Sequence, residues 1–316
     1  MAQDPRVSLV TPMYNEADNL DRFFAEIIPI LEGLKGGFEI LAIDDGSTDS
    51  TYEKLQNQHN SDNRIKVIRF RSNFGQTAAF SAGFKHSKGD IVITIDADLQ
   101  NDPKDIPGMI KKLDEGFDIV AGWRYHRQDK LFSRRLPSLL ANKLISWTTK
   151  VHLKDYGCSL KIFRKDIVKN IQLYGEMHRF IPAVASWMGV NVAEVKVNHR
   201  PRIAGVSKYG IDRSIRVVLD LITVKFLLSY STSPIQIFGL IGVTSGALGF
   251  LVALWMSIQK LFMGIPLGGR PALLLAVMLI LIGVQFVSIG LVAEMLSRTY
   301  HESQGKSTYV IKNILS

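Results

Sequence analysis

Hydrophobic residues in the N-terminal part of the chain gather in short runs that are separated by longer amphipathic stretches. The apolar runs lie at 7–10, 39–43, 65–70, 91–95 and 119–121. Apolar residues at helical spacing occupy the intervening stretches near 17–33, 49–59, 76–87 and 103–114. Strands that alternate with amphipathic helices are typical of a mostly parallel sheet with helices on both faces. The pattern therefore predicts an α/β head.

Two much longer apolar segments follow this head. The segments at 226–259 and 271–293 contain no Asp, Glu, Lys or Arg. A helix needs about 20 apolar residues to cross about 30 Å of hydrocarbon, so both segments are long enough. Pro266, Gly268 and Gly269 lie in the short connection and predict a hairpin. We expect membrane-spanning helices at about 233–259 and 272–295; the alternative is a pair of helices buried in a soluble core.

An amphipathic stretch precedes the first of these segments. Residues 211–226 place apolar side chains at helical spacing, with charged side chains on the other face. Its position next to a membrane span predicts an interfacial helix, and packing against the head is the alternative. The predicted organisation is a head at 1–210, an interfacial helix at 211–229, two spans within 230–298 and a tail at 299–316.

Charge is distributed unevenly along the chain. The formal net charge is +9, and the stretch 124–150 holds seven basic residues against one acidic residue, Asp129. A basic chain favours an anionic partner, which is nucleic acid, phosphate or an acidic membrane surface. One compact patch beside a membrane segment favours a phosphate at the membrane and argues against nucleic acid. Because only Lys260 and Arg270 flank the hairpin connection, we expect a multi-pass inner-membrane protein with its head and both termini in the cytoplasm.

Composition excludes two further classes of protein. With 47% hydrophobic and 21% charged residues, the chain is too apolar to be disordered. Its single cysteine, Cys158, cannot form an internal disulfide, so a disulfide-stabilised scaffold is excluded.

Polar residues follow the first two predicted strands. Thr11-Pro12-Met13-Tyr14-Asn15-Glu16 follows the first, and Asp44-Asp45-Gly46-Ser47-Thr48-Asp49 follows the second. Ligands bind beyond the carboxyl ends of the strands in such sheets. Ser47 or Thr48 is a plain candidate for a helix cap, whereas the adjacent carboxylates suit the N–H of a base or a ribose hydroxyl. No G-x-x-x-x-G-K-[ST] loop occurs, which excludes the usual phosphate-binding loop of NTPases.

The fourth predicted strand leads directly into a carboxylate motif. Residues 91–95 are followed by Asp96-Ala97-Asp98-Leu99-Gln100-Asn101-Asp102-Pro103. Since the two carboxylates are spaced i, i+2 after a strand, the chain must turn for both to reach one centre. Carboxylate and amide oxygens suit Mg²⁺ or Mn²⁺, with water and a diphosphate completing the shell. The alternative is a solvated turn in which Asp102 or Asn101 caps the next helix.

Seven motifs, in this order, carry a resemblance to a known family: TPMYNE, AIDDGSTDST, RSNFGQTAAFSAGFKHSKGD, TIDADLQNDP, DYGCSLKIFRK, GEMHRFIP and RIAGVSKYG. Together they resemble the family-2 glycosyltransferases of GT-A fold. More narrowly, the chain resembles the polyprenyl-phosphate glycosyltransferases, a group that includes bactoprenol glucosyltransferases and dolichyl-phosphate mannose synthases. The resemblance extends over roughly residues 5–300.

The resemblance implies a donor site and a metal site at the strand ends. The residues that would bind the donor nucleotide are Pro12, Tyr14, Glu16, Asp44, Asp45 and Gln76. The residues that would hold the divalent cation are Asp96, Asp98 and Gln100. The cation would neutralise the charge that develops on the departing nucleoside diphosphate.

The resemblance also implies contacts to an acceptor phosphate, and it places a catalytic base at Asp155. The implied acceptor residues are Arg124, Arg134, Arg135, Ser138, Arg202 and Lys208. A phosphomonoester has a second pKa near about 6, so the acceptor is largely a dianion and hardly needs a base. The alternative is that Asp155 orients the acceptor or an arginine. His178 and Arg179 are expected close to the site, and Cys158 and Tyr209 are interpreted as structural.

The implied reaction is a metal-dependent, inverting transfer of a hexose, with glucose favoured, from a UDP-sugar to undecaprenyl or polyprenyl phosphate at the cytoplasmic membrane face. Transfer from GDP-mannose and a non-catalytic membrane module are the alternatives. A processive polysaccharide synthase is disfavoured because no Q-x-x-R-W element occurs. Glycines at 239, 242, 246 and 249 would allow close helix approach, which is compatible with a homo-oligomer.

Overall fold

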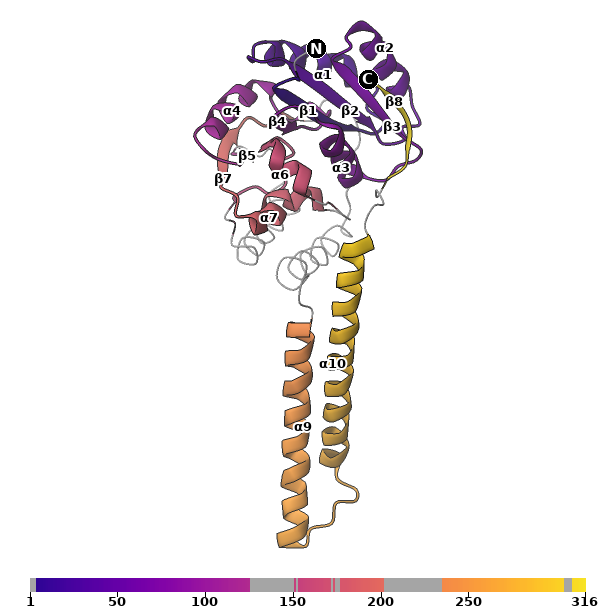
Figure 1. Ribbon diagram of the computed structural model, residues 1–316, viewed down its shortest axis with the longest axis vertical. Helices are drawn as coiled ribbons and strands as arrows, with labels where there is room; N and C mark the ends of the chain where they lie inside the picture. Colours follow the sequence, from indigo (N-terminus) through magenta and orange to yellow (C-terminus); the bar gives the residue numbers. More distant parts are fainter. Residues whose placement is uncertain are drawn as a thin grey trace. The chain divides into compact units, whose positions relative to one another are not determined.

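The computed structural model in Figure 1 describes residues 4–125, 151, 153–171, 173, 177–201, 235–303 and 309–316. The chain divides into two compact units, one formed by 1–224 with 307–316 and the other by 225–306. The predicted interfacial helix at 211–229 lies outside the described residues. So do five predicted acceptor residues, Arg134, Arg135, Ser138, Arg202 and Lys208.

The first unit contains the predicted alternation of strands and helices. Its first five strands are β1 (Val7–Met13), β2 (Phe38–Asp44), β3 (Ile65–Phe70), β4 (Ile91–Thr94) and β5 (Ile119–Arg124). The helices between them are α1 (Leu20–Glu32), α2 (Thr51–Ser61), α3 (Gln76–His86), the short 3-10 helix η1 (Pro103–Asp105) and α4 (Ile106–Asp114). All lie within a few residues of the predicted ranges.

Three further strands, which the pattern of apolar runs does not predict, complete the sheet. They are β6 (Lys161–Arg164), β7 (Val192–Val197) and β8 (Ile311–Leu315). The described strands form one eight-stranded sheet in the order β7-β5-β6-β4-β1-β2-β3-β8. β6 is antiparallel to β4 and β5, and β8 is antiparallel to β3. The other pairs are parallel, so the sheet is mostly parallel, as predicted.

Helices pack on both faces of this sheet (Figure 1). Leu9 on β1 belongs to the hydrophobic core that includes Phe23 and Ile27 of α1. The next residue, Val10, points to the opposite face, where α3 lies so close that a Cβ on Gly83 would fall 2.1 Å from Val10 Cγ1. Successive strand residues thus bury their side chains on opposite faces, which explains the continuous apolar runs.

Short elements connect β6 to β7. They are α6 (Lys165–Asn170), the 3-10 helix η3 (Met177–Phe180), α7 (Ile181–Ala185) and the 3-10 helix η4 (Ser186–Met188). Lys169 of α6 donates to the carbonyl oxygens of Phe84, Lys85 and Ser87, at 2.7, 2.9 and 2.8 Å. These bonds satisfy carbonyls at the end of α3 and fix α6 against it.

The second unit is a helical hairpin, formed by α9 (Ile235–Met263) and α10 (Pro271–Ser303). The segments Phe238–Met263 and Pro271–Ala293 are long and apolar enough to cross a membrane. Large apolar side chains on both helices are exposed, among them Leu240, Trp255 and Leu291. A pair of buried core helices would hide these side chains, so the exposure favours lipid contact.

Two glycines of the predicted stripe pack inside this hairpin. A Cβ on Gly242 would lie 2.6 Å from the carbonyl oxygen of Gly283, and a Cβ on Gly249 would lie 2.7 Å from that of Ala276. The small residues therefore let α9 and α10 approach closely within one chain.

The last residues of the chain return to the first unit. The predicted tail at 299–316 contains the end of α10, which reaches Ser303, and the strand β8 at the edge of the sheet. This strand has no clear signal in the sequence because it is short and its second and third residues, Lys312 and Asn313, are polar.

Candidate active site

The loops after β1 and β2 are bonded to one another at the carboxyl edge of the sheet. Asn15 adopts a left-handed conformation, with φ of 54°, and its N–H donates to Ser47 Oγ at 3.0 Å. In return, the Thr48 N–H donates to Asn15 Oδ1 at 2.9 Å, and the Glu16 N–H donates to Thr51 Oγ1 at 2.9 Å. Short polar side chains therefore hold the two predicted nucleotide-binding loops as one surface.

Asp44 ends β2 and is fully buried at this edge. Its Oδ2 lies 3.2 Å from Arg69 Nε, and its Oδ1 accepts the Ser47 N–H at 2.9 Å. Pro12, another predicted donor residue, is paired in register with Ile43, the residue before Asp44. The structure therefore brings the predicted donor residues of the first two strands together.

Asp45 holds the loop that leads into α3. Its two carboxylate oxygens accept the N–H groups of Phe74 and Gly75 at 2.7 and 2.9 Å. Burial raises the pKa of Asp45, and the nearby charge of Asp44 adds to this, while the two N–H bonds act in the opposite direction. Both oxygens are thus engaged by backbone, and a direct contact to the donor stays a prediction.

The motif after β4 turns as its spacing requires. Leu99 has a φ of 62° and a buried side chain, and the Gln100 N–H donates to Asp98 Oδ1 at 3.2 Å. Asp96 Oδ1 accepts a hydrogen bond from Gln76 Nε2 at 2.7 Å. Burial, followed by the charge of Asp98, raises the pKa of Asp96 to about 7. The two carboxylates are therefore close enough to repel one another.

This carboxylate pair fits a divalent cation that is shared with a diphosphate. No group of three or more His, Cys, Asp or Glu side chains suited to a metal occurs in the described part of the chain. Asp96 and Asp98 would supply two carboxylate oxygens and Gln100 an amide oxygen, and phosphate and water oxygens would supply the remainder, as Mg²⁺ and Mn²⁺ accept. Gln76, predicted at the nucleotide, bonds to Asp96 of the metal motif, and its contact to the nucleotide stays a prediction.

Arg200, which no sequence motif predicted as a site residue, holds the loop at 96–102 (the metal-motif loop) in place. Its N–H donates to the Gln100 carbonyl at 2.8 Å, and its guanidinium contacts Asp102 at 2.7 Å and Glu26 of α1 at 2.5 Å. Asp102 also accepts the Lys104 N–H at 3.1 Å, so it caps η1, as its alternative interpretation predicts. No local sequence signal connects Arg200 to a motif that lies about a hundred residues earlier.

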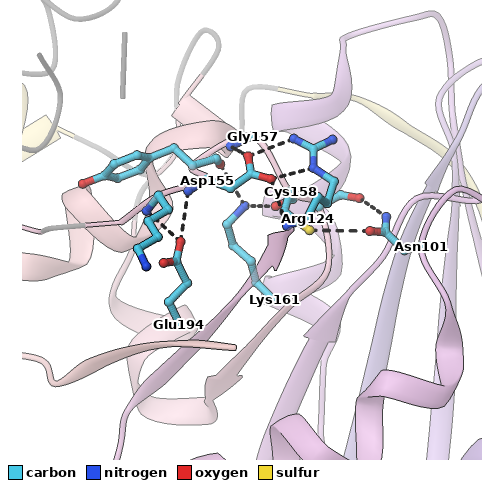
Figure 2. Close-up of polar contacts among 10 residues, drawn as sticks. Asn101, Arg124, Asp155, Gly157, Cys158, Lys161 and Glu194 are labelled. Atoms are coloured by element: carbon cyan, nitrogen blue, oxygen red, sulfur yellow. Dashed lines mark hydrogen bonds and ion pairs between the residues drawn. The ribbon is translucent and has the colours of Figure 1, made fainter. Parts of the chain in front are cut away.

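Asp155 and Arg124 form a buried ion pair (Figure 2). Arg124 Nε donates to Asp155 Oδ2 at 2.6 Å, and a terminal guanidinium nitrogen donates to Oδ1 at 2.9 Å. The Gly157 N–H adds a third bond to Oδ1 at 3.1 Å. The predicted base and a predicted phosphate ligand are therefore direct partners, which agrees with the alternative that Asp155 orients an arginine.

The buried Lys161 and the half-buried Glu194 hold the turn that carries Asp155, as Figure 2 shows. Lys161 on β6 donates through Nζ to the carbonyls of Tyr156, at 3.3 Å, and Cys158. Glu194 on β7 accepts the Asp155 N–H at 3.0 Å. Burial lowers the pKa of Lys161 and raises that of Glu194. Lys161 lies inside a recognised motif, but its role depends on where β6 enters the sheet.

Asn101 joins this turn to the metal-motif loop. Its Nδ2 donates to Ser159 Oγ at 2.9 Å, and Cys158 Sγ donates to its Oδ1 at 3.5 Å. Thr94, the last residue of β4, donates to the Ser159 carbonyl at 2.7 Å. Asn101 therefore connects two halves of the site and does not cap a helix. Burial raises the pKa of the Cys158 thiol to about 11, in keeping with its structural interpretation.

His178 lies near the site, as the resemblance implies. Its Nδ1 is 2.8 Å from Thr77 Oγ1, and its ring lies beside that of Phe80. Both partners are on α3, whose first residue, Gln76, bonds to Asp96. The motif around His178 therefore contacts the helix that borders the carboxylate pair.

Comparison with known proteins agrees with this architecture. The model of glycosyl transferase family 2 matches residues 8–172. Dodecaprenyl-phosphate galacturonate synthase of Rhizobium johnstonii is 40% identical over 99% of this chain and 94% of its own length. Undecaprenyl-phosphate 4-deoxy-4-formamido-L-arabinose transferase of Shewanella sediminis is 35% identical over 98% of this chain and 92% of its own length.

A solved structure shares the fold of the first unit at low sequence identity. Glucosyl-3-phosphoglycerate synthase of Mycobacterium tuberculosis, crystallised with Mn²⁺, uridine diphosphate and glucosyl-3-phosphoglycerate, aligns with a TM-score of 0.56 and 17% identity. The alignment covers 71% of this chain and 80% of that protein. From the family match and the identity across nearly the full chain, the protein belongs to glycosyl transferase family 2 and is a glycosyltransferase of GT-A-like fold.

Proposed function

We propose that this glycosyltransferase moves a sugar from a UDP-sugar to a polyprenyl phosphate at the cytoplasmic face of the inner membrane. The observation that carries the proposal is the hydrogen bond from Asn101 Nδ2 to Ser159 Oγ. It joins the loop that carries Asp96 and Asp98 to the turn whose Asp155 is paired with Arg124. A donor diphosphate and an acceptor phosphate would thus meet in one bonded framework. The relatives named for dodecaprenyl and undecaprenyl phosphate support the lipid acceptor.

The reaction would be a displacement with inversion at the anomeric carbon. An oxygen of the acceptor phosphate forms the new bond to that carbon, while the bond to the nucleoside diphosphate breaks and its electron pair leaves with the diphosphate. A Mg²⁺ or Mn²⁺ held by Asp96, Asp98 and Gln100 would supply charge neutralisation for the diphosphate. The joined loops that carry Tyr14, Glu16 and Asp44 would bind the nucleotide.

Asp155 would act in this reaction as a positioning residue. A phosphomonoester with a second pKa near about 6 is already largely a dianion at neutral pH, so attack does not require proton removal. Both carboxylate oxygens of Asp155 accept hydrogen bonds from Arg124. The pair would aim the guanidinium at the acceptor phosphate, to which arginine bonds with defined geometry.

The topology is supported by the sheet itself. β1 near the start of the chain and β8 at its end belong to one sheet, so the two ends lie on the same side of any membrane that α9 and α10 cross. Two spans satisfy this condition. The positive charge outside the hairpin connection would place that side in the cytoplasm.

The identity of the transferred sugar is the most specific part of the proposal. The sequence resemblance favours glucose on UDP, and the relatives are named for galacturonate and for 4-deoxy-4-formamido-L-arabinose. The test incubates the purified full chain with Mn²⁺ or Mg²⁺, undecaprenyl phosphate and each of four donors: UDP-glucose, UDP-galacturonate, UDP-4-deoxy-4-formamido-L-arabinose and GDP-mannose. Mass spectrometry then detects lipid-linked sugar. Product from a UDP-sugar supports the proposal. Product from GDP-mannose alone contradicts a UDP-sugar as the donor, and no product with any donor contradicts the proposal as a whole.

A further inference from the structure

The strand at the end of the chain forms the edge of the sheet beside the donor site. β8 runs antiparallel to β3, with Leu315 opposite Val67 and Asn313 opposite Arg69. Beyond the strand, the Arg71 N–H donates to the Val310 carbonyl at 3.0 Å. Figure 1 shows β8, in yellow, alongside β3. A segment that follows both apolar helices in sequence thus lies against the strand that precedes the loop bound by Asp45.

One route from β8 leads to Asp44. Asn313 Nδ2 donates to the Tyr52 hydroxyl at 3.1 Å. The guanidinium carbon of Arg69 lies 4.0 Å from the centre of the Tyr52 ring, and Arg69 Nε lies 3.2 Å from Asp44 Oδ2. The side chain of Asn313 therefore fixes the ring of Tyr52. Arg69 lies over this ring and also pairs with Asp44, so the ring adds a cation–π contact to the ion pair.

A second route leads to Asp45. Tyr309 is only 7% exposed, and its ring stacks on that of Phe70, with centroids 5.0 Å apart and planes inclined by 15°. Phe70 packs edge-on against Phe74, at 5.8 Å, and the Phe74 N–H donates to Asp45 at 2.7 Å. The C-terminal segment therefore supports the loop before α3 as well.

We propose that the side chains of Tyr309 and Asn313 are positioning residues for the nucleoside diphosphate part of the donor. The inference rests on the proposed role of Asp44 and of the loops around it in binding the nucleotide. Neither residue would touch the donor. They would keep the Arg69–Asp44 pair and the loop bound by Asp45 in the conformation that the nucleotide needs, so their loss lowers donor affinity and leaves the acceptor side of the site unchanged.

The test measures nucleotide binding by the full-length protein in detergent with Mn²⁺ present. The variants are Tyr309→Ala, Asn313→Ala and Tyr309→Phe, of which the last keeps the aromatic ring. Val310→Ala is the control, because the side chain of Val310 is 50% exposed. Calorimetry gives the Kd for UDP and for GDP. Loss of an aromatic pair predicts a Kd about three- to tenfold higher for Tyr309→Ala. Asn313→Ala is expected to weaken binding to a smaller extent, and Tyr309→Phe and Val310→Ala to stay within about twofold of wild type.

A second measurement separates positioning from general destabilisation. Where lipid-linked sugar is formed, the KM for the donor should rise in Tyr309→Ala while the KM for undecaprenyl phosphate stays within about twofold of wild type. If Tyr309→Ala does not fold, Tyr309→Leu and Asn313→Ala take its place. The inference is overturned if folded variants bind the nucleotides with wild-type affinity, or if the KM values for donor and acceptor change equally. It is also overturned if the wild-type protein binds neither UDP nor GDP. Binding that responds as expected without any lipid-linked product would instead leave the inference intact and contradict the proposed acceptor.

Discussion

The guanidinium of Arg124 donates to both carboxylate oxygens of Asp155, at 2.6 and 2.9 Å, and the carboxylate is almost fully buried. Removing one partner of such a pair leaves the other charge buried without compensation. The two residues therefore act as a unit, and their substitution tests whether that unit orients the acceptor or removes a proton.

Asp155→Asn keeps the shape of the side chain and removes its charge. Because the Arg124 guanidinium would lose its ionic partner, we expect kcat/KM for undecaprenyl phosphate to fall about tenfold to hundredfold, largely through KM. A positioning role predicts that the acidic limb of the pH–rate profile, near the phosphate pKa of about 6, persists in the variant. Disappearance of that limb in Asp155→Asn would identify Asp155 as the base. Asp90→Asn, at an exposed carboxylate, is the control and should behave as wild type.

Asp98→Ala tests the cation site. The variant leaves Asp96 as the single carboxylate of the pair, so we expect transfer to fall at least about a hundredfold, while the protein remains in the membrane fraction. Chelation of divalent cations by EDTA should abolish transfer by the wild type, and added Mn²⁺ or Mg²⁺ should restore it. Full activity of Asp98→Ala, or of the chelated enzyme, would exclude the metal assignment.

Arg200→Met tests the fastening of the metal-motif loop. The variant loses the contacts of the guanidinium to Asp102 and Glu26, so the loop around Gln100 should be held less firmly. We expect the Mn²⁺ concentration for half-maximal activity to rise about threefold to tenfold, in line with loss of a charged hydrogen bond. Arg22→Met is a matched control, because Arg22 binds the same Glu26 from an exposed position. Equal effects of the two variants would show that only surface charge matters.

Glu39→Gln tests a buried carboxylate away from the site. Glu39 accepts bonds from Ser8 Oγ at 2.5 Å, the Lys88 N–H at 2.7 Å and Lys66 Nζ at 2.6 Å. Burial alone raises its pKa, but these partners outweigh burial, so the pKa of Glu39 lies below the ordinary value of 4.5.

A lowered pKa in the folded state fixes the sign of the pH dependence. The stabilisation by Glu39 is present above pH 4.5 and is lost as the pH falls through the folded-state pKa. At pH 7 we expect Glu39→Gln to lower the free energy of unfolding by about 1–3 kcal/mol. The difference from wild type should shrink below pH 4.5, as measured by thermal unfolding across pH. Glu53→Gln, at an exposed carboxylate, should show no such difference. If the difference in stability between Glu39→Gln and wild type stayed constant across pH, the lowered pKa of Glu39 would be contradicted.

Much of the fold follows from local sequence alone. The strands β1 to β5 and the helices between them have strong periodic signals, because each strand buries side chains on both faces and each helix buries one stripe. The strands β6 and β8 lack such signals because both are short and contain charged residues. β6 begins with Lys161 and ends with Arg164, and β8 contains Lys312. Their places in the sheet depend on hydrogen-bonding partners far away in sequence.

The same division holds for the site. The sequence by itself determined an α/β head with a carboxylate motif after the fourth strand, and two apolar helices, since periodicity, length and spacing are local properties. Only the tertiary structure decided that Arg124 pairs with Asp155, that Arg200 contacts Asp102 and that Tyr309 stacks on Phe70. These contacts join residues that lie tens to hundreds of positions apart, and packing of the whole sheet is what brings them within bonding distance.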